Sequence, residues 1–354
     1  MKKTLLIVII AVLAFGVLNA ETKLKMELWN RWTYAMEDGE VTENEMALKR
    51  GYLRLEPKFT GKIKGRFNLD FYSSDSNSDA AGVGIKLKYA YLDFSELLPV
   101  ANSKVTIGLM KTYFGTIYDW DYTTIDKDPS DKYKFVSSTD YGLGFGGYLP
   151  NGMGTYNLAA YNGEGYKKVG DNINKDMNFV ANLRVTPIVG VTVGGSYMMK
   201  TKNDSQIDDG TGEMIDNPDR IQYNMMAGVG KLAFGKFSLL AQYLNKITTM
   251  PNMDGSEDET ETVISLLPVF KVNNQFDIIG RYDINDPNTD AENDAETTIT
   301  AGFNYHILRD SKNNPKLFVQ TNYQMVQPED EDANSESELA IQLRWIFSET
   351  INKK

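Results

Sequence analysis

The chain has 354 residues, no cysteine, one histidine and a formal net charge of −11. The lack of cysteine excludes disulfides, thiolate metal sites and a lipidated cysteine, and the acidic balance argues against the basic surface that nucleic-acid binding needs. The length suits one large all-β domain or two smaller domains.

The first predicted element is a signal peptide. Lys2 and Lys3 precede an apolar run over residues 5–18, which is shorter than the roughly 20 residues of a membrane-spanning helix and has the flanks of a secretory signal. We therefore expect a signal peptide at 1–20 and a single domain at 21–354, with an uncleaved anchor as the alternative. Without those two lysines, 35 Lys and Arg face 48 Asp and Glu, a net charge of −13.

The clearest β pattern lies over residues 48–72, where polar and apolar residues alternate on either side of Thr60-Gly61. Leu53 and Leu55 fall in one phase, and Arg50 and Arg54 fall in the other. Because the side chains of a strand point alternately to its two faces, this stretch predicts a hairpin with one apolar and one charged face.

The same two-residue period predicts about sixteen strands. In chain order they are 23–36, 48–59, 62–72, 83–95, 104–114, 139–148, 155–161, 176–186, 189–200, 220–234, 236–247, 261–272, 275–284, 297–308, 316–325 and 338–347. In 83–95 the apolar phase contains Val83, Ile85, Leu87, Tyr89 and Tyr91. The strand around Pro268 is the weakest, because proline cannot donate a hydrogen bond to a neighbouring strand.

The connections alternate between long and short. The short ones are 60–61, 150–154, 187–188, 235 and 273–274, and the long ones, which carry most of the acids, are 37–45, 73–82, 115–138, 162–175, 201–219, 248–260, 285–296 and 327–337. With an even number of strands, this alternation places short turns on one rim and long loops on the other. A soluble β-sandwich has no reason to sort its loops in this way.

The pattern predicts an all-β fold: a transmembrane, antiparallel, up-and-down β-barrel of about 16 strands with short periplasmic turns and long acidic external loops. Such a barrel lies in the bacterial outer membrane, in contact with outer-membrane lipid. Aromatic residues near the strand ends indicate two girdles, although scattered core aromatics would give a similar pattern. The girdle residues are Phe59, Phe234, Phe237, Phe276 and Phe347 on the short-turn rim, and Phe71, Tyr113, Tyr197, Tyr282 and Tyr323 on the other.

Several stretches resemble the phosphate-selective porin O/P family. They are 50–71, 90–94, 105–115, 156–165, 172–176 and 184–187, so the resemblance covers roughly 48–200. It implies a homotrimer of sixteen-stranded pores, often passing anions, in which the third long loop, 115–138, folds inward as a constriction. The family's arginine ladder cannot be matched residue by residue, and residues 348–354 follow Phe347 where such barrels usually end.

If the apolar faces meet lipid, the other faces line a lumen with a basic wall in its first strands. Its residues are Arg50, Arg54, Lys58, Lys62, Lys64, Arg66, Lys86, Lys88 and Lys104, against Glu56 and Asp70. We expect this wall to face the acids of the third loop, Asp119, Asp121, Asp126, Asp128 and Asp131. Opposed charges across a narrow pore set ion selectivity, whereas the alternative is that a water-filled interior simply tolerates such charges.

Other motifs carry little. Gly142, Gly144 and Gly147 satisfy a dinucleotide-binding pattern, but no helix is predicted after them. The single histidine, His306, has no evident nucleophile, which disfavours a membrane phospholipase and any enzyme. Residues 283–294 match a calcium loop in acid content only. We expect no cofactor and no metal site, apart from weak divalent binding by the acidic loops as an alternative.

Three functions remain open at this point. The first is a porin for passive diffusion of small hydrophilic solutes, with a preference for anions of the phosphate type. The second is a structural or adhesive surface barrel with little transport, and the third is a soluble secreted β protein.

Overall fold

The structure is a computed structural model that describes residues 20–74, 82–167, 176–202, 207–208, 214–215, 221–249 and 258–352. Apart from Ala20, the expected signal peptide lies outside the described residues, as do parts of three expected loops and most of the loop at 201–219. No helix within the described residues is long and apolar enough to cross a bilayer.

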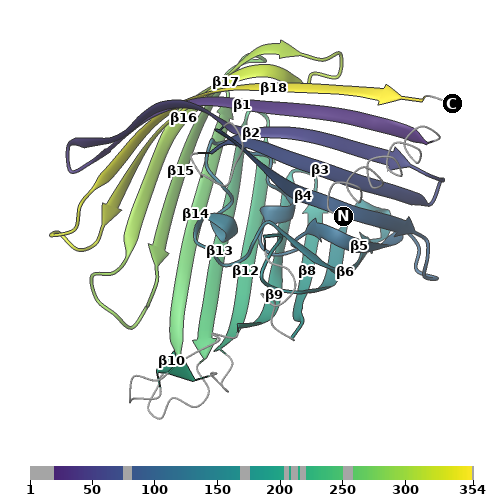
Figure 1. Ribbon diagram of the computed structural model, residues 1–354, viewed down its shortest axis with the longest axis horizontal. Helices are drawn as coiled ribbons and strands as arrows, with labels where there is room; N and C mark the ends of the chain where they lie inside the picture. Colours follow the sequence, from purple (N-terminus) through teal and green to yellow (C-terminus); the bar gives the residue numbers. More distant parts are fainter. Residues whose placement is uncertain are drawn as a thin grey trace.

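Within the described residues, sixteen antiparallel strands close into one barrel, as the sequence predicts (Figure 1). They are β1 (Glu21–Glu37), β2 (Glu40–Lys58), β3 (Ile63–Ser73), β4 (Val83–Ser95), β5 (Ser103–Lys111), β6 (Thr139–Tyr148), β7 (Gly154–Tyr161), β8 (Asn178–Ile188), β9 (Val191–Lys202), β12 (Ile221–Phe234), β13 (Phe237–Thr249), β14 (Glu259–Lys271), β15 (Phe276–Asp286), β16 (Glu296–Arg309), β17 (Pro315–Pro328) and β18 (Glu336–Ile351). Each strand pairs with its neighbour in the sequence, β9 pairs with β12, and β18 closes the ring against β1. Closure leaves the barrel without the open sheet edges that a membrane would not tolerate.

Five short elements of the described residues lie outside the barrel wall. Strands β10 (Ile207–Asp208) and β11 (Met214–Ile215) form a separate two-stranded sheet. The 3₁₀-helix η2 (Ile117–Asp119) and the helix α2 (Pro129–Lys132) both belong to the β5–β6 connection, and a further 3₁₀ turn, η3 (Pro150–Gly152), joins β6 to β7.

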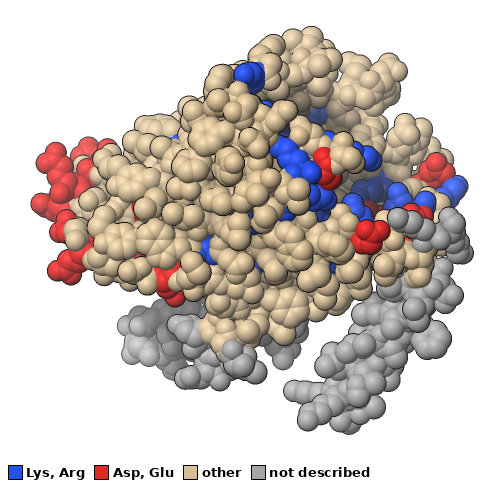
Figure 2. Space-filling model, turned by 90° about the horizontal axis from the view of Figure 1, so that it is seen from above, with Lys and Arg blue, Asp and Glu red and all other residues tan. Residues whose placement is uncertain are grey.

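The loops sort by length as expected, with one exception. The connection at 37–45, expected to be a long loop, is a tight turn at Asp38-Gly39, because β1 and β2 continue as a long hairpin. Both turn residues have positive φ angles, 49° and 85°, which suits an Asp-Gly hairpin turn. The acids expected there still lie at this rim, but on strands. In Figure 2 acidic residues cover the left end of the molecule, while Lys and Arg gather around its hollowed right-hand part.

Two strand ends also differ from expectation. The expected turn at Pro187-Ile188 falls inside β8, and the chain reverses at Val189-Gly190 instead. The expected tail after Phe347 continues β18, so that Ser348 pairs with Lys25 and Ile351 with Thr22. Pairing with β1, a long strand, extends the barrel wall to the end of β18.

A bulge in β4 changes which tyrosines face inward. Asn68 of β3 pairs with Tyr89, but Leu69 pairs with Leu87, so that Lys88 is an extra residue. An extra residue reverses the alternation beyond it. Lys88 and Tyr89 are consequently both buried in the barrel, and the expectation that Tyr89 and Tyr91 share the outer face with Leu87 is wrong.

Pro268 lies within β14 and interrupts the pairing with β15. Leu266 pairs with Tyr282, and pairing resumes only at Val269 with Ile279. Pro268 remains a register partner of Leu239 on the other side. A proline that cannot donate is thus accommodated at a local gap in the ladder.

The lipid-facing surface can be tested by placing a charge on it. Leu183 of β8 is 48% exposed on the outside, whereas Thr155 of β7 lines an interior cavity. We expect Leu183→Arg to destabilise the barrel by about 2–4 kcal/mol, because it places charge in the hydrocarbon region. Thr155→Arg, whose guanidinium can reach water, should cost less than half as much. Urea unfolding in lipid vesicles measures both changes, and the reverse ranking would show that the assigned faces are exchanged.

Candidate pore constriction

The β5–β6 connection, residues 112–138, folds into the barrel and packs on one side of its inner wall. Tyr113, Phe114, Ile117, Phe135 and Val136 supply its apolar contacts. They form one buried cluster with inward residues of the wall, namely Met110, Ala159, Tyr161, Val180, Met198, Met225, Ala227, Leu244 and Val263. Burial of this apolar surface fixes the loop against β5, β7–β9 and β12–β14. Tyr113 is therefore inside the barrel and is not a girdle residue.

The start of the loop is held by polar contacts as well. Gly115 has a φ of 52°, a conformation that glycine adopts without strain. A Cβ there would lie 2.5 Å from Ser130 Oγ. Its N–H donates to Ser196 Oγ at 3.1 Å, and its carbonyl accepts from Arg184. These contacts require a residue without a side chain at this position.

The tip of the loop reaches the far wall, where side chains donate to its carbonyl oxygens. Arg344 Nη1 donates to the carbonyl of Tyr122 at 2.9 Å, and Gln320 Nε2 donates to the same carbonyl at 3.0 Å. Asn304 Nδ2 bonds the carbonyl of Thr123 at 3.1 Å, and Arg281 Nη1 bonds that of Lys127 at 2.6 Å. The loop therefore crosses the interior from β5 to β15–β18 and divides it.

Two of the five loop acids pair with cations away from the basic wall. Asp119 forms an ion pair with Lys231 of β12. Asp126 lies 3.6 Å from Arg281 Nη1 and 3.2 Å from Lys132 Nζ. Although burial alone would raise it, these two cations hold the pKa of Asp126 below its usual range.

The third acid, Asp128, is buried at the start of α2 and caps the helix. Its Oδ1 accepts from Ser130 N at 2.8 Å, and its Oδ2 accepts from the Thr116 hydroxyl. Burial raises the pKa of Asp128 to about 6, although these hydrogen bonds favour the charged form.

The remaining loop acids, Asp121 and Asp131, share a cavity of about 330 Å³ with the basic wall. Asp128 also borders this cavity, which lies between the loop and β1–β5. The cations that line it are Lys25, Arg54, Arg66, Lys88, Lys111 and Arg344, and the acids are Glu27, Asp121, Asp128 and Asp131. Glu27 is engaged by Arg344 at 2.6 Å. The structure thus brings only part of the expected basic wall and part of the expected acids to one place.

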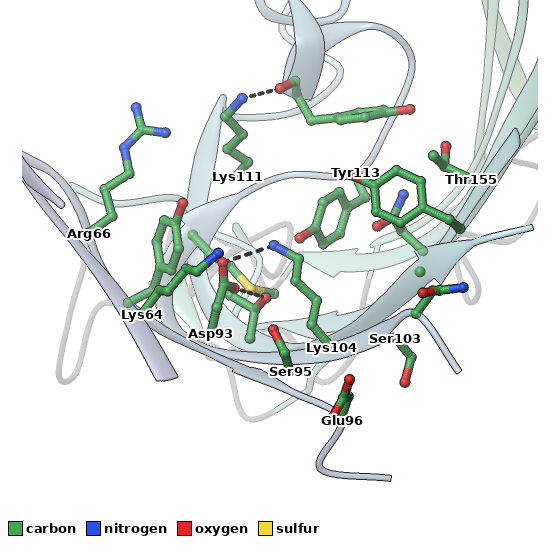
Figure 3. A pocket seen from close by; sticks show the side chains of 18 residues that line it. Lys64, Arg66, Asp93, Ser95, Glu96, Ser103, Lys104, Lys111, Tyr113 and Thr155 are labelled. Carbon is green, nitrogen blue, oxygen red and sulfur yellow. Dashed lines mark hydrogen bonds and ion pairs between the residues drawn. The ribbon is translucent and has the colours of Figure 1, made fainter. Parts of the chain in front are cut away.

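A second cavity, of about 620 Å³, continues along β3–β7 on the short-turn side (Figure 3). Lys64, Arg66, Lys104 and Lys111 line it, against Asp93 and Glu96. The two acids are again engaged: Asp93 lies 3.0 Å from Lys104 Nζ, and Glu96 lies 2.9 Å from Lys62 Nζ. Figure 3 shows Lys111 bonded to the loop, at the carbonyl of Tyr118. It shows Lys64, Arg66 and Lys104 around the same cavity. Positive side chains are left in excess.

Aromatic rings hold the arginines of the wall in place. The Arg66 guanidinium lies 4.0 Å from the Tyr89 ring centroid, and that of Arg50 lies 4.6 Å from the Trp29 ring. Arg50 also pairs with Asp70 at 3.4 Å. Stacking on a ring fixes a guanidinium without removing its charge.

The other candidates lie away from the two cavities. Lys58 and Lys62 are on the short-turn rim, where Lys58 faces Glu21 at 3.7 Å and Lys62 is bonded to Glu96. Lys86 lies over the Tyr72 ring at 3.7 Å. Arg50 lines a smaller cavity of about 260 Å³ on the other side of Tyr122.

Lys25, Lys111 and Arg344 are the cavity cations that were not among the candidates. Lys25 falls in the polar phase of β1, opposite Leu24 and Met26, and this phase could have identified it. Lys111 falls in the apolar phase of β5, so that alternation points it toward lipid. A charged residue in that phase is itself the signal, because lysine at mid-membrane is costly and turns inward where the strand ends. No group of three metal-ligating side chains occurs within the described ranges.

The closed sixteen-stranded barrel and the loop folded into it define an outer-membrane porin, a channel of the bacterial outer membrane. A family model for "Phosphate-selective porin O and P" matches residues 24–231, more than half of the chain, and the chain belongs to this family.

Solved structures agree on the fold. The chain is similar to the trimer form of the outer-membrane protein OmpT of Vibrio cholerae, with 13% identity, 93% of this chain and 100% of that chain covered, and a TM-score of 0.64. The chain is 12% identical to an anion-selective porin from Comamonas acidovorans, with 93% of this chain and 100% of that chain covered and a TM-score of 0.64. It is 13% identical to the outer-membrane channel DcaP of Acinetobacter baumannii, with 93% of this chain and 98% of that chain covered and a TM-score of 0.64. Among curated proteins none matches the chain.

Proposed function

We propose that this porin conducts small hydrophilic anions by passive diffusion, along a path between the β5–β6 loop and the basic wall of β1–β5. The observation that carries the proposal is the excess of cations over free acids along the 330 Å³ and 620 Å³ cavities. Three acids there are engaged by Arg344, Lys104 and Lys62. Asp128 is buried and bonded to hydroxyl and backbone groups.

The sign of the ion selectivity depends on where the charges lie and not on the net charge of the chain. Acids on the external rim are in water, where charges beyond a Debye length of about 8 Å are screened at physiological salt. Lys64, Arg66 and Lys111 act on a solute inside a narrow passage with low-dielectric walls. The local positive charge should therefore prevail over the net charge of −11.

Assembly and chemistry complete the proposal. We place the working form as a homotrimer, because one similar solved structure is described as a trimer.

The proposal includes no catalysis. His306 Nε2 lies 2.8 Å from Asp277 Oδ2, while its Nδ1 has no partner in the described part of the chain. That pair does not provide the nucleophile, base and orienting group of a hydrolase.

The experiment is a reversal-potential measurement across a KCl gradient in planar bilayers. We expect the wild type to prefer chloride, and Lys64→Glu with Arg66→Glu to weaken or invert the preference. Lys58→Glu, which changes a rim residue outside both cavities, is the matched control and should alter it far less. A cation-selective wild type would overturn the proposal. A barrel without conductance would favour a structural surface role.

A further inference from the structure

A third interior cavity, of about 650 Å³, lies on the opposite side of the β5–β6 loop from the basic wall. It opens at the short-turn end of β13–β18, and its roof is the loop segment at Tyr122 and Thr123. Asp277, Asn304 and His306 line this cavity and neither cavity of the anion path proposed above.

Three buried hydrogen-bond acceptors line this cavity without a partner among the described residues. They are Asp277 Oδ1, Asn304 Oδ1 and His306 Nδ1, on side chains that are each less than 10% exposed. Asp277 and Asn304 are register partners on β15 and β16, and His306 follows Asn304 by two residues on the same face. The three atoms thus belong to one patch.

The orientation of each acceptor is fixed by a second bond. Asn304 donates through Nδ2 to the carbonyl of Thr123, which leaves its Oδ1 as the free atom. His306 Nε2 lies 2.8 Å from Asp277 Oδ2, and the neutral tautomer that donates to this carboxylate through Nε2 has Nδ1 as an acceptor. Buried acceptors without donors are costly, and a ligand that supplies hydroxyl donors would satisfy them.

The same cavity has more positive than negative side chains in its lining. Lys236, Lys271, Arg309 and Arg344 line it, against the acids Asp121 and Asp277. Lys236 and Arg309 are held at the rim by the turn carbonyls of Val272 and Asn274, at 2.8 Å and 2.6 Å. Their charges therefore stay beside the opening and would attract an anionic group.

We infer that this cavity is a binding site for a polyhydroxylated organic anion, of the sugar phosphate or sugar acid class. The hydroxyl groups donate to Asp277, Asn304 and His306, and the anionic group lies toward Lys236, Lys271 and Arg309. The inference rests on the proposed function, because the solute must enter an anion-conducting barrel.

Other ligand classes fit the cavity less well. An organic ammonium would find the acceptors but would be repelled by four cations. A simple inorganic anion would meet the cations but leave the three acceptors unsatisfied. A divalent metal ion at the three acceptors would have a single carboxylate and a single imidazole, in a cavity with four positive side chains.

The test is current block in planar bilayers, with glucose 6-phosphate, glucose and inorganic phosphate as probes. We expect glucose 6-phosphate to reduce the current at a lower half-blocking concentration than either of the others. Asp277→Asn should raise this concentration about tenfold, since a hydrogen bond to a charged acceptor is stronger than one to a neutral acceptor. It should leave the effect of inorganic phosphate unchanged. His306→Phe removes one acceptor at similar size and should act in the same direction.

The control is Asp93→Asn, a change of the same kind in the 620 Å³ cavity, which should leave the half-blocking concentration within twofold of wild type. The site is ruled out if glucose 6-phosphate and inorganic phosphate block equally. It is also ruled out if Asp93→Asn acts as strongly as both Asp277→Asn and His306→Phe. If either of these results is found in a pore that is anion-selective, only the binding site is ruled out and the proposed function stands. If the pore is cation-selective, the proposed function itself is ruled out.

Discussion

Asp283→Ala is expected to destabilise the protein by about 3–5 kcal/mol and to loosen the β5–β6 loop. Asp283 is fully buried on β15 and accepts from Arg281 Nε at 3.0 Å and from Ser265 Oγ at 2.6 Å. Two loop side chains also reach it: Tyr133 OH at 3.2 Å and Lys132 Nζ at 3.4 Å. Removing one member of such a network leaves buried charge without its partner, and this is the costly case.

Two measurements follow the change. Urea unfolding in detergent micelles reports the loss of stability, and single-channel recordings report the loop as increased current noise. Asp290→Ala, in the exposed β15–β16 connection, is the control and should change stability by less than about 0.5 kcal/mol. Wild-type stability together with wild-type noise in Asp283→Ala would contradict the role of Asp283 as the anchor of the loop.

The barrel was predictable because its membrane setting imposes a strict alternation. Lipid on one side and water on the other require a period of two, and the hairpin around Thr60-Gly61 shows it without interruption. Pro187 misled because proline often ends a strand, whereas here it lies within β8. The strand around Pro268 was expected and is present, with its pairing to β15 interrupted at the proline. Likewise, the acids at 37–45 suggested a loop, yet strands that project beyond the membrane face water on both sides and accept glutamate.

The interior was less predictable, because it depends on contacts between residues far apart in the sequence. The bulge at Lys88 is invisible to a periodicity argument, and it places Tyr89 beneath Arg66. The partners of Asp119 and Asp126 lie on β12 and β15, more than 100 residues away. Composition could suggest a basic wall and an acidic loop. It could not show which of the loop acids form ion pairs with cations on the opposite wall of the barrel.

Such long-range placement also determines how the constriction should respond to pH. Burial raises the pKa of Asp128 to about 6 in the folded protein, compared with about 3.9 for an unfolded aspartate. The folded state therefore binds more protons than the unfolded state between these two values. The contribution of Asp128 to folding stability is therefore greatest below about pH 4, falls as the pH rises toward 6 and is constant above.

A shift of about two units corresponds to about 3 kcal/mol. Asp128→Asn stays neutral at every pH and keeps an oxygen that can accept from Ser130 N. The unfolding free energy of the wild type minus that of this variant should therefore fall by about 2 kcal/mol between pH 4 and pH 7, and then stop changing. Urea titrations of both proteins across this range measure the difference, and a difference independent of pH would refute the assignment. Since Asp128 caps α2 inside the barrel, its protonation should also make the loop less mobile. We therefore expect less current noise in single wild-type channels at pH 5 than at pH 7, and the same noise at both pH values in Asp128→Asn.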